Sequence, residues 1–183
     1  MRLIETWLAD QERAFDLFAK FPAEETGFEN PAAGMSREQF AAYVQSLRDE
    51  SMGIGLPDGW VPATKYILVN DEDDYVGIFN LRHRLTDFLR NGPGHIGYGI
   101  AREYRGRGYA TTGLKLTLAK AREIGIEEAY LSVHKTNPAS LAVQQHCGAR
   151  IDHEDETEYY TRVDTRTGMM ASMREAIDDA SRV

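Results

Sequence analysis

Hydrophobic positions recur along this chain with two different periods, and the periods predict the order of helices and strands. Spacings of three and four residues indicate amphipathic helices after Asp10, after Ser36, over residues 108–124 and over residues 138–147. Alternation of apolar and polar residues, or a short apolar run, indicates strands at residues 2–8, 65–70, 75–85, 95–101, 129–134, 149–154 and 157–163. Residues 51–63 hold three glycines and two prolines, so we expect an ordered loop there.

Local signals mark where the helices begin. Asp10 and Asn137 can cap a helix with their side chains, and Pro138 fits the first helical position. Ser36 and Gln39 form a capping box. The predicted apolar faces are Ala14, Phe15, Phe18 and Ala19 in the first helix, Phe40, Tyr43, Val44 and Leu47 in the second, and Leu114, Leu118, Ala121 and Ile124 in the third.

The order of these elements combines an antiparallel meander with a strand–helix–strand crossover. That combination predicts an α+β fold with a mixed sheet, in one domain over residues 1–163. Residues 164–183 form a tail with Met170, Met173, Ile177 and Ala180 at helical spacing, and we expect a short docked helix there.

Composition narrows the class of partner. Of the 183 residues, 21 are Lys or Arg and 29 are Asp or Glu, which gives a net charge of −8 and argues against nucleic acid or an anionic membrane as partner. No apolar run approaches the roughly 18 residues of a membrane span. Cys147 has no second cysteine to pair with, and the N-terminus carries acids where a signal peptide is apolar, so we expect a cytoplasmic protein.

The segment GHIGYGIAREYRGRGYATTG, residues 94–113, is the most informative. A strand runs into a helix through a turn that contains Gly106 and Gly108 and is flanked by three arginines. Glycines let the backbone approach a ligand, and the first turn of a helix offers unpaired N–H groups to an anion, here a pyrophosphate. The spacing does not match a P-loop, and Thr111 stands where a dinucleotide fold needs glycine.

The residues Arg105-Gly106-Arg107-Gly108-Tyr109-Ala110 match the [R/Q]-x-x-G-x-[G/A] motif, and the chain resembles the GNAT acyltransferase superfamily. A second match begins at Asn137 and Ser140 and ends in Cys147-Gly148-Ala149. The resemblance is clear over residues 64–163, and within the superfamily it points to a bacterial group of predicted acetyltransferases without an assigned substrate. It implies a mostly antiparallel sheet with helices on both faces and a splayed pair of parallel strands that holds the coenzyme.

The resemblance also implies acetyl-coenzyme A as co-substrate, and we expect no metal. The pyrophosphate would lie on the N–H groups of Gly106 through Ala110, and the pantetheine arm would pair with the strand end like an added strand. Asn137 would reach the pantetheine amides, although capping a helix explains this residue equally well. The implied cofactor-binding residues are Ile100, Ala101, Arg102, Arg105, Gly106, Arg107, Gly108, Tyr109, Ala110, Thr111, Asn137 and Ser140.

The implied chemistry is direct attack by a primary amine of a small molecule or peptide on the thioester, which needs a base and a proton donor for the thiolate. His95 is the expected base because it lies on the strand that leads to the glycine turn, and His83 is the alternative. Members of the superfamily commonly use a tyrosine as the acid where this chain has Gln144. His146 or water would replace it, or the thiolate leaves unprotonated. Cys147 is expected to be a small buried residue.

The acceptor and the assembly stay open at this stage. The excess of acid favours a cationic amine, whereas Arg82 and Arg84 suit an acceptor with a carboxylate. Two other readings are a coenzyme-binding module without turnover, which the missing tyrosine suggests, and a protein-interaction domain on the same fold. A homodimer is a further hypothesis taken from the habit of the family.

Overall fold

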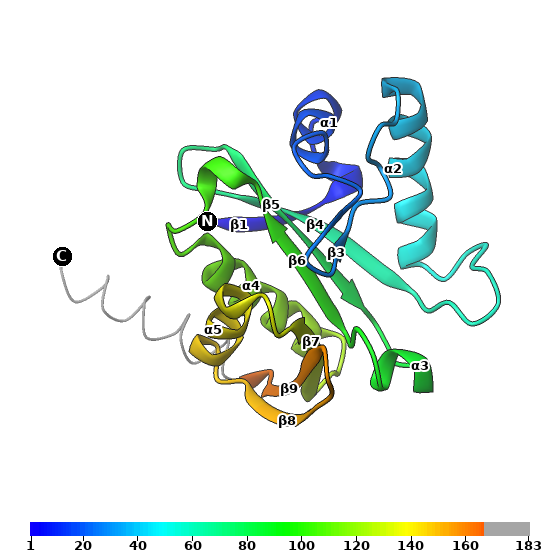
Figure 1. Cartoon of the computed structure of the whole chain (residues 1–183). Coiled ribbons are helices and arrows are strands. Elements are labelled where there is room, and N and C mark those ends of the chain that lie inside the picture. Colours follow the sequence, from blue (N-terminus) through cyan, green and yellow to red (C-terminus); the bar gives the residue numbers. More distant parts are fainter. Residues whose placement is uncertain (167–183) are drawn as a thin grey trace, which may run out of the picture.

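The computed structural model describes residues 1–166 (Figure 1). Its helices are α1 (Gln11–Phe18), α2 (Arg37–Ser51), α3 (Asp87–Arg90), α4 (Tyr109–Glu123) and α5 (Pro138–His146). Its strands are β1 (Arg2–Glu5), β2 (Glu24–Glu25), β3 (Phe28–Glu29), β4 (Ala63–Val69), β5 (Tyr75–Arg82), β6 (Ile96–Ile100), β7 (Glu128–His134), β8 (Arg150–Glu154) and β9 (Glu158–Asp164). The predicted helix in the tail lies outside the described residues.

The predicted elements are present, and their caps form as expected. The Asp10 side chain accepts from the N–H of Arg13 at 3.0 Å, and both hydrogen bonds of the Ser36–Gln39 capping box are made. Residues 6–8 form a 3-10 turn where the sequence predicted the end of a strand. Short elements escaped prediction, namely α3 and the hairpin of β2 and β3, because two to four residues carry no measurable period.

Two details of the predicted helix faces are wrong. In α1 Leu17 is buried and Ala19 is exposed, because the helix ends at Phe18 and Ala19 only caps it. Ile124 is 46% exposed because it is the C-cap of α4, beyond the last turn that packs on the sheet.

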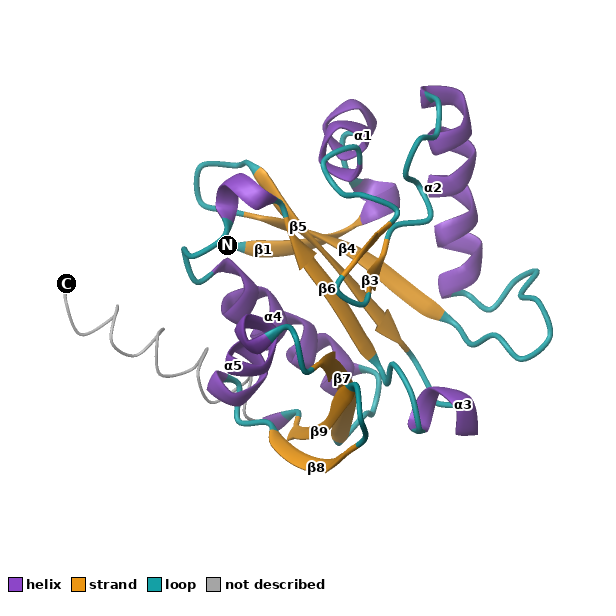
Figure 2. Ribbon diagram, in the orientation of Figure 1, coloured by secondary structure: helices purple, strands orange, loops and turns teal. Residues whose placement is uncertain are grey.

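The strands form two main sheets that meet at β6 and β7 (Figure 2). One has the order β1-β4-β5-β6 and the other β7-β9-β8, and every ladder among residues 1–166 is antiparallel. β6 and β7 are the pair expected to run parallel and splay. They share no ladder and meet only before β6 begins, where the N–H of His95 donates to the carbonyl of Tyr130 at 2.6 Å.

Helices cover both faces of the first sheet (Figure 1). Alternate residues of β4 point to opposite faces, so Ile67 packs under α1 and α2 while Leu68 packs under α4. α4 approaches the sheet closely because it has Gly113 there: a Cβ at this position would lie 2.1 Å from Cζ of Phe79. This packing fixes the N-terminus of α4 at the end of β6.

Candidate active site

The turn between β6 and α4 has a backbone that depends on glycine. Gly106 and Gly108 have φ values of +76° and +79°, a region in which side chains are strained. No atom lies within 4 Å of the place where either Cβ would be. The turn is therefore open to a ligand on the side where side chains would stand.

The same turn offers unpaired N–H groups. The first helical hydrogen bond of α4 runs from the N–H of Thr112 to the carbonyl of Gly108 at 3.1 Å. Within the described part of the chain, the N–H groups of Gly106 through Thr111 have no acceptor. Free N–H groups and the positive end of a helix dipole are the features with which helix N-termini bind anions, so the geometry of the turn is compatible with the predicted anion site.

The three arginines of the motif differ in their freedom. Arg105 is held in place: its Nε donates to the carbonyl of Ile100 at 2.9 Å, and its guanidinium contacts both carboxylate oxygens of Glu25 at 2.5 and 3.2 Å. The Arg102 side chain is 86% exposed and makes only a long contact with Glu25, at 3.8 Å, and Arg107 lies over the ring of Tyr104 at 5.7 Å. Arg102 and Arg107 are thus available to a phosphate, whereas Arg105 braces the turn.

The edge of β6 that faces β7 is open. The carbonyl of His95 and the N–H of Ala101 bond to β5, so by the antiparallel alternation Ile96, Tyr98 and Ile100 direct their backbone groups to the other edge. Ala101, which the sequence placed in the pantetheine site, uses its N–H on Val76. Tyr98 was missed, although the alternation around Ile100 could have indicated it.

Tyr98 also joins β6 to α5. Its hydroxyl lies 2.9 Å from Oγ of Ser140, in the first turn of α5, and its ring stacks on Phe79 at 5.4 Å. Burial raises the pKa of Tyr98 to about 12, so this hydroxyl keeps its proton at neutral pH. Gln144 also interacts with the Tyr98 hydroxyl. A tyrosine hydroxyl therefore lies beside the position of the acid that the family uses.

Gln144 itself has a structural role. It is buried, its amide donates to the carbonyl of Ser132 at 3.4 Å, and its oxygen accepts from the Thr161 hydroxyl at 2.6 Å. These contacts tie α5 to β7 and β9. Gln144 is thus engaged with the sheet behind it.

The hairpin of β2 and β3 bridges the two main sheets. Glu25 contacts Arg105 at the end of β6, and Thr26 accepts from the Asn137 amide at 3.2 Å. Asn137 also caps α5, accepting from the N–H of Ser140 at 3.1 Å. Both Arg105 and Asn137, predicted to contact the cofactor, hold this hairpin here.

His95 lies where the two sheets meet and is 6% exposed. Its Nδ1 accepts from the N–H of Tyr130 at 3.0 Å, so the neutral ring carries its proton on Nε2 and has no free lone pair. Burial, together with the charges of Arg90, Arg82 and Arg162, lowers its pKa to about 4. This geometry disfavours the predicted role of His95 as the base.

The other predicted candidates have local partners. His83 lies just after β5, where its Nε2 is 2.9 Å from Oγ1 of Thr64, and burial lowers its pKa. His146 is exposed and contacts the carbonyl of Ala142. Cys147 is buried, as expected, and burial raises its pKa to about 11.

Charged residues gather on the α2 side of the first sheet. This charged cluster comprises Lys65 on β4, Arg82 on β5, Glu50 on α2 and Glu29 on β3, which interact electrostatically. Between residues 1 and 166, no ion pair shorter than 4 Å joins its members. Burial raises the pKa of Glu50 above that of an exposed glutamate. The sequence reasoning missed Lys65, Glu50 and Glu29, because their strands and helix are far apart in the chain.

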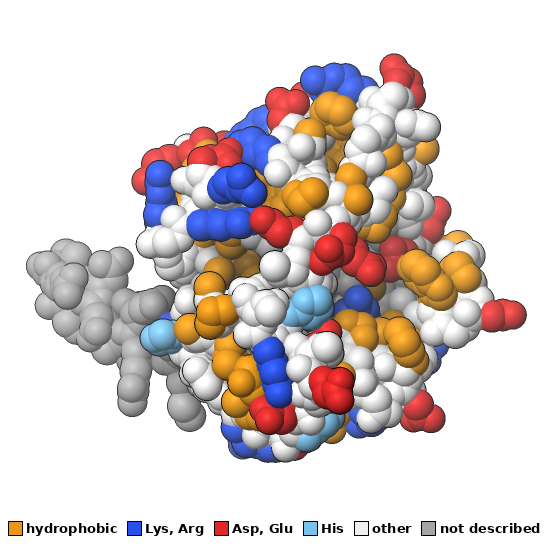
Figure 3. All heavy atoms as spheres, viewed as in Figure 1, with side chains coloured by type: hydrophobic (Ala, Val, Ile, Leu, Met, Phe, Trp, Pro, Cys, Tyr) orange, Lys and Arg blue, Asp and Glu red, His pale blue; other side chains and the backbone are white. Residues whose placement is uncertain are grey.

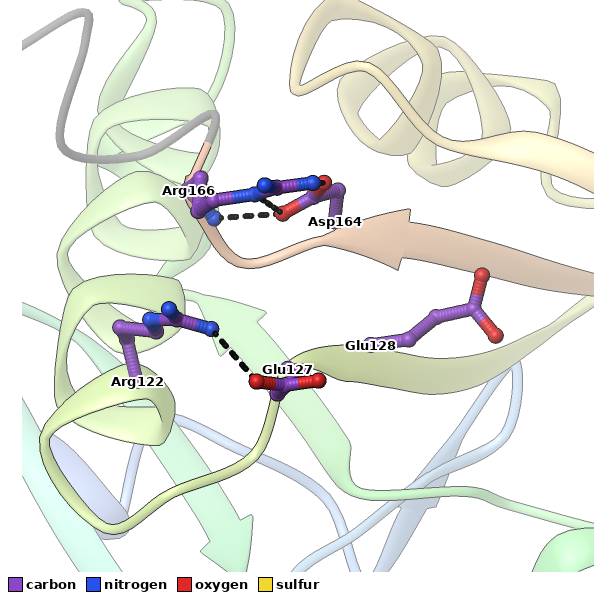
Figure 4. A pocket seen from close by; sticks show the side chains of 5 residues that line it. All are labelled: Arg122, Glu127, Glu128, Asp164 and Arg166. Carbon is purple, nitrogen blue, oxygen red and sulfur yellow. Dashed lines mark hydrogen bonds and ion pairs between the residues drawn. The ribbon is translucent and has the colours of Figure 1, made fainter.

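A separate hollow of about 240 Å³ lies at the other end of α4, lined by Arg122, Glu127, Glu128, Asp164 and Arg166 (Figure 4). α4 is 15 residues long, so about 22 Å separates this hollow from the glycine turn. Four of its side chains pair with one another, Arg122 with Glu127 at 3.6 Å and Arg166 with Asp164, and Glu128 pairs with Arg150. The hollow is therefore distinct from the site described above.

The charged side chains show no single-sign patch on one face of the molecule, and neither a metal cluster nor a membrane span is found among the described residues. Acidic and basic side chains are interspersed over the face seen in Figure 3. Among the described residues, no group of three or more His, Cys, Asp or Glu side chains is arranged to hold a metal ion. No helix over residues 1–166 is long and apolar enough to cross a membrane.

Comparison with known proteins agrees with this architecture. No curated protein sequence matches the chain. The spermidine N-acetyltransferase of Vibrio cholerae in complex with CoA and spermine superposes with a TM-score of 0.61 at 14% identity, over 92% of this chain and 97% of that one. The N-acetyltransferase PseH of Campylobacter jejuni in complex with acetyl coenzyme A superposes with a TM-score of 0.58 at 12% identity, over 89% of this chain and 97% of that one. A putative GnaT-family acetyltransferase from Bordetella pertussis superposes with a TM-score of 0.60 at 16% identity, over 88% of this chain and 93% of that one.

These structural matches share the fold, and a family model decides the membership. A model described as an acetyltransferase (GNAT) domain matches residues 3–150, which is most of the chain. The α+β fold and the resemblance found in the motifs are thereby confirmed. The chain belongs to the GNAT family of acetyltransferases.

Proposed function

We propose that this protein transfers an acetyl group from acetyl-coenzyme A to a primary amine by direct attack on the thioester. The observation that carries the proposal is the row of unpaired N–H groups from Gly106 to Thr111 beside the open edge of β6. The turn supplies donors for a pyrophosphate, and the open edge supplies backbone groups for an extended amide chain. Coenzyme A contains both chemical features.

Different residues of this chain would bind different parts of the coenzyme. The N–H groups of the turn bind the pyrophosphate, and Arg102 and Arg107 neutralise its charge from the exposed side. The outward backbone groups of Tyr98 and the outward N–H of Ile100 pair with the pantetheine arm; the carbonyl of Ile100 already accepts from Arg105. The Thr111 hydroxyl adds a donor at the phosphate end. Arg105 acts indirectly, because its bonds to Ile100 and Glu25 keep the turn in place.

Glu50, in place of His95, accepts the proton of the attacking amine. Its pKa is raised by burial, so the carboxylate is a stronger base than an exposed glutamate, and it interacts with Lys65 and Arg82 of the charged cluster. The amine nitrogen bonds to the thioester carbon, its proton passes to the Glu50 carboxylate, and the carbon–sulfur bond breaks.

Tyr98 donates a proton to the leaving sulfur, and both residues then exchange protons with water. Its hydroxyl keeps its proton at neutral pH and lies beside Gln144, the position at which the family commonly has its acid. We expect Tyr98→Phe and Glu50→Gln each to lower kcat at least about tenfold with little change in acetyl-coenzyme A binding. An unchanged kcat for either variant would remove that residue from the reaction.

The first experiment is thermal unfolding with and without acetyl-coenzyme A, because it needs no knowledge of the acceptor. At 100 times Kd the ligand adds about 2.7 kcal/mol, which raises Tm by roughly 5–11 °C for a chain of this length. ATP and NAD serve as ligand controls. No shift at millimolar acetyl-coenzyme A would refute the proposal, and a shift without release of coenzyme A from any amine would favour a binding module.

Two glycine variants make the test specific to the turn. Gly108 and Gly34 have similar positive φ values, +79° and +76°, and both have open space around the position of a Cβ. Substitution by valine therefore imposes comparable backbone strain at both positions. We expect Gly108→Val to lose the shift caused by acetyl-coenzyme A and Gly34→Val to retain it. Equal shifts in the two variants would mean that the coenzyme binds elsewhere.

A further inference from the structure

The face of the first sheet that carries α1 and α2 changes from apolar to polar along its strands. Ile78 pairs with Ile67 and with Gly99, and Phe21 and Phe28 cover this row, since a Cβ on Gly99 would lie 2.9 Å from Phe21. The next row along the strands is Lys65, Asn80 and Gly97, followed by Arg82. The polar end of this face lies on β6, the strand whose other edge is proposed to bind the coenzyme.

This polar end has room for a ligand. Residues in one row of a sheet carry their side chains on the same face, so Asn80 stands beside the position where Gly97 has no side chain, and Lys65 stands on the far side of Asn80. No atom lies within 4 Å of the place where a Cβ on Gly97 would be, in contrast to the crowded Gly99. The open space thus lies beside Asn80, in the same row of the sheet as Lys65 of the charged cluster.

Among the described residues, the two cations of the charged cluster form no close ion pair and interact with its two carboxylates at longer range. Lys65 is partly buried and makes no ion pair with any described residue; its ammonium lies 6.0 Å from the ring centre of Tyr43. Arg82 is half-buried and donates only to the carbonyl of Gly94, at 3.1 Å. Burial lowers the pKa of both residues, that of Lys65 to about 8. A desolvated cation without a close ion pair is costly, and binding an anion would offset that cost.

The anions of the charged cluster indicate which kind of ligand fits. Glu50 and Glu29 bring its formal charge to zero, so a polyanion would meet two carboxylates and a polycation would meet two cations. A ligand with one positive and one negative charge matches both the carboxylates and the cations of the charged cluster. Guanidinium and ammonium groups bind a carboxylate through charge-assisted hydrogen bonds, and Glu50 is an acceptor for an ammonium group.

We propose that the acceptor is an amine that also carries a carboxylate, an amino acid or a close relative of one, with Lys65 and Arg82 binding the carboxylate and Glu50 facing the amine. This inference rests on the proposed acetyl transfer and names its substrate class. It selects one of the two acceptor types that composition left open. It also explains why two partly desolvated cations persist near a sheet edge that is open to a coenzyme.

The test compares acceptors that differ only in the carboxylate. Release of coenzyme A is measured with α-, β- and γ-amino acids and dipeptides, each against its amide, and with the diamine putrescine. We expect kcat/KM for at least one acid to exceed that for its amide by tenfold or more. If no acid exceeds its amide by tenfold, the inference is overturned, whether or not other amines react.

Variants assign the preference to residues. Lys65→Met keeps a long apolar stem and should raise KM for the preferred acid at least tenfold while KM for its amide changes little. Arg82→Lys keeps the charge but loses the guanidinium. It should also raise KM for the preferred acid, by a smaller factor, while KM for the amide changes little. Lys120→Met removes a cation paired with Glu123 on α4 and should leave both constants unchanged. Equal losses for acid and amide in Lys65→Met would overturn the role of Lys65.

Failure of the proposed acetyl transfer and failure of the proposed carboxylate preference give different results. The shift in Tm caused by acetyl-coenzyme A should persist in Lys65→Met, because the glycine turn is untouched. If wild type shows no shift, the proposed acetyl transfer fails. If the shift is present and amides or putrescine react as well as the acids, acetyl transfer stands and the carboxylate preference is wrong.

Discussion

Lowering the pH tests how His95 is held. In the folded protein its ring is buried and neutral, accepts a hydrogen bond from the N–H of Tyr130, and has a pKa lowered to about 4. In the unfolded chain a histidine titrates near pH 6.5. Between these two values the unfolded chain holds more protons than the folded one, so the free energy of unfolding falls as the pH decreases.

The magnitude follows from the two pKa values. A difference of about 2.5 units corresponds to about 3 kcal/mol in total, present above pH 6.5 and lost as the pH falls through 4. About 2 kcal/mol of this is lost by pH 5. Carboxylates also titrate in acid, so the wild-type curve alone does not isolate His95.

Urea denaturation at pH 8, 7, 6 and 5 in wild type and His95→Asn isolates the contribution. Asparagine offers an oxygen in place of Nδ1 to accept from Tyr130 and does not titrate. We expect wild type to lose about 2 kcal/mol more than His95→Asn between pH 8 and 5. His146→Asn, at an exposed position, controls for the removal of a histidine. Parallel pH profiles for wild type and His95→Asn would refute the reasoning and reopen His95 as an accessible base.

Three further predictions concern packing and buried polar groups. Gly113→Ala should destabilise by about 1–3 kcal/mol, although alanine favours helices, because its Cβ would lie 2.1 Å from Phe79; an increase in the urea midpoint would contradict the close packing of α4. Tyr43→Phe should leave stability unchanged or raise it by up to about 1 kcal/mol, because the buried hydroxyl has no partner among residues 1–166; a loss in the same assay would reveal one. Gln144→Leu should cost about 2–3 kcal/mol by leaving the Thr161 hydroxyl unpaired, and a neutral result would contradict the tie between α5 and β9.

Sequence reasoning succeeded where the signal is local. The caps at Asp10, Ser36 and Asn137 and the glycine turn at 106–108 depend on residues within one turn of chain, and each has the predicted geometry. Hydrophobic periods located the longer helices and strands for the same reason, because a buried face repeats along its own element. The hairpin of β2 and β3 has no such repeat.

The roles of single side chains depended on contacts between distant segments. Arg105 could contact a phosphate by its motif, but Glu25, eighty positions earlier in the chain, holds it. His95 has the chemistry of a base, yet the N–H of Tyr130 occupies its lone pair. The sequence by itself determined the α+β class and the glycine turn at the start of α4, because both follow from local geometry. Only the tertiary structure decided which titratable groups are free, because partners and burial arise when separate strands and helices pack together.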